Sequence, residues 1–146
     1  MRGKIALTLA FLALAAPMAR SQQPGAPTAM MMVRWSDLVG EWVGNALRPT
    51  NDSVVTPLTL SFGTDNKAWL KFPDREPVAV RVLSMAGDSV VADAGPYPSV
   101  TRVGHQVTVH IVAHVRNHML WGEATGHFDD GGDSMVSRIK LDHQVH

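Results

Sequence analysis

Apolar and polar residues alternate along most of this chain, which is the pattern of strands that bury one face. In the segment 54–62, one face carries Val54, Thr56, Leu58, Leu60 and Phe62. In the segment 105–115, every odd position from 107 onward is apolar, whereas His110 and His114 lie on the opposite face. Two segments with this period indicate a sheet whose inner face is apolar and whose outer face is solvated.

Turn-forming residues divide the rest of the chain into similar segments. Strands are expected through Trp42, Gly44 and Ala46, over 54–62, 67–72, 76–85 and 89–94, through Val100 and Arg102, and over 105–115, 119–128 and 135–141. The connections between these eight or nine strands are short, so neighbours in the chain pair antiparallel. We therefore predict an all-β fold, an up-and-down meander that closes into a small barrel.

The opening stretch 35–47 is the most informative part of the sequence. Ser36 or Asp37 can cap a single helical turn, because a short side-chain oxygen accepts an otherwise unpaired backbone N–H. Gly40 allows a sharp change of direction before the first strand. Trp42 then precedes small residues on the same strand face, which suits a barrel end that is plugged by one large ring.

The N-terminus has the composition of an export signal. Basic residues at the start precede an apolar run over 5–16, and small residues follow, so residues 1–21 are predicted to be a secretory signal peptide. The run is too short for an ordinary transmembrane helix. Residues 22–34, which contain two prolines, are expected to be a flexible leader, and residues 35–146 a single barrel domain. We expect the mature protein in the periplasm or outside the cell.

Composition and charge exclude several partner classes. The chain has no cysteine, which rules out disulfides, thiolate metal sites and the lipid-acceptor cysteine of a bacterial lipoprotein. Without the three basic residues of the predicted signal, the formal net charge falls from +0 to about −3, and no basic run is present. We therefore expect no nucleic-acid partner, no membrane span and a monomeric protein.

The sequence Gly40-Glu41-Trp42 resembles the start of lipocalins and fatty-acid-binding proteins, whose first strand opens with one helical turn and a Gly-x-Trp. The resemblance implies a calycin-type barrel in which Gly40 and Trp42 are structural. It also implies that an arginine of the last strand, here Arg138, packs over the tryptophan in a cation–π contact. The run from Gly40 to Gly44 followed by Pro49 is similar to the first strand of nitrobindin-type haem barrels, and segments 87–91 and 94–97 resemble short secreted bacterial proteins.

Large apolar residues on the strands are the candidates for a ligand site. We predict that a small apolar molecule binds in the barrel or at its mouth, against Trp42, Leu60, Phe62, Trp69, Ile111 and Trp121. The alternative is a packed barrel with no ligand, which serves an envelope or protein-interaction role, because a small barrel can be filled by its own side chains.

The polar residues give little support for catalysis, and we predict no enzyme. No Gly-x-Ser-x-Gly motif and no paired carboxylates stand out. The chain has seven histidines, but His110 and His114 are about 13 Å apart on an extended strand and cannot share one ion. Asp129, Asp130 and Asp133 are interpreted as a solvated turn. We predict no metal and no cofactor, and haem or metal binding through histidines remains a further alternative.

Overall fold

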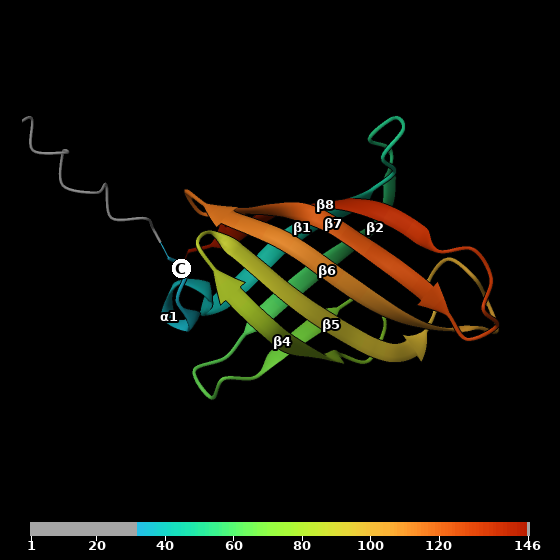
Figure 1. The fold of residues 1–146 in the computed structure, drawn as a ribbon, viewed down its shortest axis with the longest axis horizontal. Helices are drawn as coiled ribbons and strands as arrows, with labels where there is room; N and C mark the ends of the chain where they lie inside the picture. Colours follow the sequence, from blue (N-terminus) through green and yellow to red (C-terminus); the bar gives the residue numbers. More distant parts are fainter. Residues whose placement is uncertain (1–31, 146) are drawn as a thin grey trace, which may run out of the picture.

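The computed structural model describes residues 32–145, which form a closed antiparallel barrel of eight strands in chain order, with β8 paired to β1 (Figure 1). A short helix, α1 (Trp35–Leu38), precedes the first strand. The strands are β1 (Gly40–Leu47), β2 (Val54–Phe62), β3 (Ala68–Lys71), β4 (Val78–Ala86), β5 (Ser89–Pro98), β6 (Gln106–Arg116), β7 (Met119–Phe128) and β8 (Met135–Gln144). The predicted all-β meander with one helical turn is confirmed.

Of the eight or nine strands expected, the structure has eight, because β5 is longer than predicted and no strand forms through Val100 and Arg102. Residues 95–98, which lie beyond the expected strand 89–94, belong to β5, and the pairing of β5 with β6 shifts register between Ala94 and Tyr97. Val100 and Arg102 lie in the loop that follows and not in a strand. A bulge of this kind bends a strand without ending it, so glycine and proline at positions 95 and 96 did not mark a strand end.

The alternation of residue types matches the two faces of the barrel wall. On β2, Thr56, Leu58, Leu60 and Phe62 are buried. On β6, Val107, Ile111 and Ala113 are buried, whereas His110 and His114 are partly exposed. The core is therefore the interior of the barrel, as the period of two predicts.

Helix α1 closes one end of the barrel. Asp37 accepts a hydrogen bond from the backbone N–H of Arg34 (2.9 Å), which holds the single turn. Leu38 is fully buried, and the ring of Trp35 packs edge-on against Phe62. Figure 1 shows α1 and the C-terminal part of the chain at this end, with the loops β5–β6 and β7–β8 at the other.

Two glycines allow the wall strands to approach closely. A Cβ on Gly44 would lie 2.0 Å from the carbonyl oxygen of Lys140, and one on Gly122 would lie 2.0 Å from that of Val112. Both obstacles are backbone atoms of neighbouring strands, which side-chain movement cannot clear. Glycine inside a strand therefore marks the points where the wall curves most tightly.

The predicted signal peptide (1–21) and all but the end of the predicted leader (22–34) lie outside the described residues. At that end, the backbone N–H of Val33 donates to the carbonyl of Gly87 (2.7 Å), which ties the leader to the β4–β5 turn. Within residues 32–145, no helix has the length and apolar character needed to cross a membrane.

Candidate functional site at the open end of the barrel

The barrel holds an apolar cavity of about 90 Å³ in the half away from α1. Its lining includes residues of β2, β6 and β7 as well as the start of the β5–β6 loop. Among the lining residues are Val55, Leu58, Leu60, Leu70, Phe72, Tyr97, Ser99, Val109, Ile111, Ala124, Gly126, Phe128 and Ile139. Val100 and Thr101 belong to the β5–β6 loop, so the cavity lies next to the end of the barrel away from α1, which we call the mouth.

Small side chains on neighbouring strands explain why space remains here. In register across the wall, Ile111 pairs with Ala124, which pairs with Ser137, and the next row holds Val109, Gly126 and Met135. Ala124 and Gly126 supply little volume at the middle of each row. Ser137 beside Ala124 is small as well, so the side chains of these two rows do not fill the interior at this level.

Tyr97 brings a polar group to this apolar cavity. It lines the cavity and is 8% exposed. Burial disfavours the charged phenolate and raises the pKa of Tyr97 to about 12, so the hydroxyl stays protonated at neutral pH. A neutral phenol can donate or accept one hydrogen bond from a molecule in the cavity.

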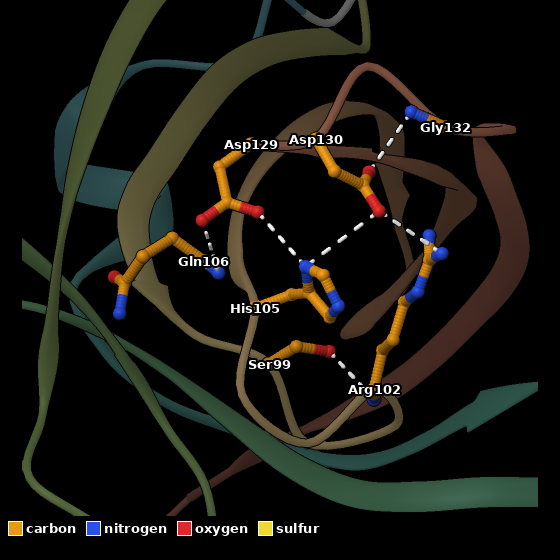
Figure 2. Close-up of polar contacts among 7 residues, drawn as sticks. All are labelled: Ser99, Arg102, His105, Gln106, Asp129, Asp130 and Gly132. Atoms are coloured by element: carbon orange, nitrogen blue, oxygen red, sulfur yellow. Dashed lines mark hydrogen bonds and ion pairs between the residues drawn. The ribbon is translucent and has the colours of Figure 1, made fainter.

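Charged side chains from two loops meet at the mouth (Figure 2). The His105 Nδ1 atom lies 3.1 Å from an Asp129 oxygen and 3.6 Å from an Asp130 oxygen. The Arg102 guanidinium contacts the same Asp130 oxygen at 3.0 Å and lies over the Phe128 ring at 5.0 Å from its centroid. His105 and Arg102 belong to the β5–β6 loop, and the two aspartates belong to the β7–β8 loop.

Backbone hydrogen bonds hold these two loops in place. Asp129 donates its backbone N–H to the carbonyl of Gln106, and its carboxylate accepts one from the Gln106 N–H (3.2 Å). The Gln106 N–H and the His105 ring together hold the pKa of Asp129 below its ordinary value. Ser99 Oγ accepts hydrogen bonds from the N–H groups of Thr101 and Arg102, which fixes the start of the β5–β6 loop.

The six predicted ligand residues fall into three groups. Leu60 and Ile111 line the cavity. Trp42 and Phe62 are buried, but they pack toward the closed end and are not among the lining residues.

Trp69 and Trp121 are placed differently from the prediction. They are 38% and 36% exposed and lie on the outer surface. Their chain neighbours Ala68, Leu70 and Leu120 take the inward positions. Side chains alternate between faces, so a large ring beside a buried residue on a strand must point outward.

The predicted contact of Arg138 with Trp42 is also wrong. Arg138 lies on the outer face of β8, where its guanidinium pairs with Asp52 at 3.2 Å. His143 occupies the position expected for Arg138, because its ring stacks on the Trp42 ring with centroids 4.4 Å apart. Its Nε2 donates to the carbonyl of Val39 (3.0 Å), and Gly40 leaves room for the ring, because a Cβ there would lie 2.6 Å from that nitrogen.

The other strand histidines lie on the outer wall with polar partners. His110 Nδ1 is 2.6 Å from Asp93, and His114 Nδ1 is 3.1 Å from Asp88. Each of these two histidines therefore has its own carboxylate partner. His127 Nδ1 lies 3.1 Å from the hydroxyl of Ser134.

Sequence reasoning missed the mouth cluster and the role of His143. His105 and Asp129 are 24 positions apart and become neighbours only through the pairing of β6 with β7. A signal for His143 was present, since its position is two residues beyond the inward Leu141 on the same face of β8.

Comparison of the chain with models of known protein families, with curated proteins and with solved structures finds no match.

Proposed function

We propose that the mature protein is a secreted β-barrel of the lipocalin-like type that binds the apolar part of a small molecule in its cavity. The cavity itself carries this proposal. Its lining is mostly aliphatic and aromatic, it lies at the end of the barrel away from α1, and its buried polar residues are few, namely Tyr97, Thr56, Ser99 and Ser137. Ligand sites combine a largely apolar lining with few polar groups in this way.

The size of the cavity limits the ligand. Sites for drug-sized molecules usually enclose about 300–1,000 Å³, and an apolar cavity of about 150 Å³ takes up benzene. A cavity of about 90 Å³ is smaller than that benzene-binding cavity and suits a short alkyl group or at most one small ring, with any polar part of the molecule at the mouth. A haem group is far too large for this space.

Short n-alcohols and benzene are suitable probes. We expect saturable binding, followed by NMR amide shifts, with the largest changes at cavity-lining residues such as Ile111 and Ala124. Ala124→Leu should abolish these shifts because the new side chain occupies the cavity. Filling the cavity should leave the free energy of unfolding unchanged or raise it by about 0.5–2 kcal/mol.

Two matched variants control this experiment. Thr125→Leu puts the same side chain one residue away on the outer face and should leave probe binding intact. Ala113→Leu faces inward, but Ala113 is not among the lining residues and is 1% exposed, so this change should cost about 1–3 kcal/mol by overpacking. Binding that persists in Ala124→Leu would refute the cavity as the site.

The packed barrel with an envelope or interaction role is the second candidate. The observation that favours it is the small cavity volume, because most of the interior is filled by the chain's own side chains. It becomes the better account if none of the probes binds saturably at millimolar concentration.

A further inference from the structure

We propose that His105, Asp129 and Asp130 form a binding site for a divalent transition-metal cation of the zinc class at the mouth of the barrel. The site is separate from the apolar cavity and does not depend on ligand binding there. It differs from the interpretation of Asp129, Asp130 and Asp133 as a solvated turn, because it gives two of these residues a ligand.

The donor atoms already have nearly the spacing that such an ion requires. One donor atom from each of the three residues lies within 4.8 Å of the others, and His105 Nδ1 is 3.1 and 3.6 Å from the two carboxylates. Bonds of about 2.0–2.2 Å in a tetrahedral site place donor atoms roughly 3.3–3.6 Å apart. Small side-chain rotations therefore suffice to bind an ion.

A cation already occupies part of this site. The Arg102 guanidinium lies 3.0 Å from the Asp130 oxygen that also faces His105. The Asp130 carboxylate thus binds positive charge in the folded protein, and this charge belongs to a side chain that is 43% exposed. Arg102 can leave Asp130 and remain over the Phe128 ring, which lets a metal ion replace it.

The donor set selects the kind of ion. Imidazole nitrogen favours zinc, cobalt, nickel and copper, whereas calcium and magnesium prefer sites made of oxygen alone. Three protein donors leave a fourth tetrahedral position for water. Two hydrogen bonds hold together the loops that carry the donors, one from the Asp129 N–H to the Gln106 carbonyl and one from the Gln106 N–H to the Asp129 carboxylate. Little ordering is therefore needed on binding.

The test uses tag-free purified protein titrated with Co²⁺, read by its visible absorption, and with Zn²⁺ in a calorimeter. We expect one ion per chain. His105→Gln and Asp130→Asn should each weaken binding at least tenfold. Arg102→Gln should tighten binding several-fold, because it removes the competing guanidinium. Calcium at the same concentration should not displace the cobalt signal.

The other histidines provide the controls. His127→Gln changes a surface histidine of the adjacent strand that is not part of the cluster, and it should bind cobalt as the unmodified protein does. Ala124→Leu should also bind cobalt normally, which separates this site from the apolar cavity. Absence of stoichiometric binding, or equal affinity in the His105→Gln protein, would overturn the proposal, and circular dichroism verifies that each variant is folded.

Discussion

At the scale of single residues, Trp42 shows how one side chain fixes an end of the barrel. It is 1% exposed, its indole N–H donates to the carbonyl of Leu38 (2.8 Å), and one ring face stacks on His143. The Gly-x-Trp motif therefore has the structural role that the sequence implied. Its partner is a histidine and not the arginine that the lipocalin resemblance suggested.

This exchange of partner gives a direct prediction. His143→Ala should lower the free energy of unfolding by about 1–3 kcal/mol, because it removes an aromatic stack and a hydrogen bond to Val39. Arg138→Ala removes only an exposed ion pair and should cost at most about 1 kcal/mol. Urea titration of both variants measures the difference, and a larger loss for Arg138→Ala would contradict this packing.

Residue identity alone did not reveal which tryptophans face inward. Trp69 and Trp121 are large and apolar, yet the inward positions beside them hold Ala68, Leu70 and Leu120. When a strand has apolar residues at both its odd and its even positions, either set could face the interior of the barrel. Only the pairing with neighbouring strands decides which set is buried. For this reason, two of the six predicted ligand residues lie on the outer surface of the barrel.

At the scale of the elements, the wall depends on strands that approach closely at glycines. Gly122 on β7 lies between β6 and β8, where it pairs with Ala113 and Ile139. A methyl group there meets the carbonyl of Val112, which belongs to the strand backbone. The two strands would have to separate to admit it.

We therefore expect Gly122→Ala to cost about 3 kcal/mol or more, near the upper end of overpacking. Gly126→Ala is the matched control on the same strand, because its new methyl meets the side chain of Val107 at 3.1 Å, and that side chain can adjust. Its cost should be about 1 kcal/mol. Thermal or urea unfolding compares the two, and equal costs would argue against close backbone approach at Gly122.

At the scale of the whole molecule, the free energy of unfolding should decrease as the pH falls into the acidic range. The hydrogen bond from His114, together with the charges of His114 and Arg116, lowers the pKa of Asp88 from its ordinary value of 3.8. A carboxyl whose pKa is lower in the folded state adds stability above about pH 3.8. That contribution disappears as the pH falls through the lowered pKa.

Below about pH 4, the free energy of unfolding of the Asp88→Asn protein should therefore decrease less with falling pH than that of the unmodified protein. The measurement is urea unfolding at a series of pH values from 6 to 2. Asp74→Asn, at an exposed position of the β3–β4 loop, serves as the control. Identical pH profiles for the Asp88→Asn protein and the unmodified protein would show that Asp88 is not linked to folding.

The sequence by itself determined the class of fold, the order of the strands and the inward face of the clearest ones. Alternation and short turns are local properties, and both β6 and the part of β2 from Thr56 onward follow them. Val54, predicted on the inner face, is 56% exposed, because the pairing of β1 with β2 shifts register at that end. The sequence also placed Gly40, Trp42 and the helical turn at the start of the barrel. These features arise from side chains within a few positions of each other.

Tertiary structure alone decided the cavity, the mouth cluster and the partner of Trp42. The cavity depends on which residues share a row across three strands, and His105 reaches Asp129 only because β6 and β7 pair in one register. His143 reaches Trp42 only because β8 closes the barrel onto β1. Each is a contact between residues distant in the chain, and register and closure set such contacts where local pattern does not.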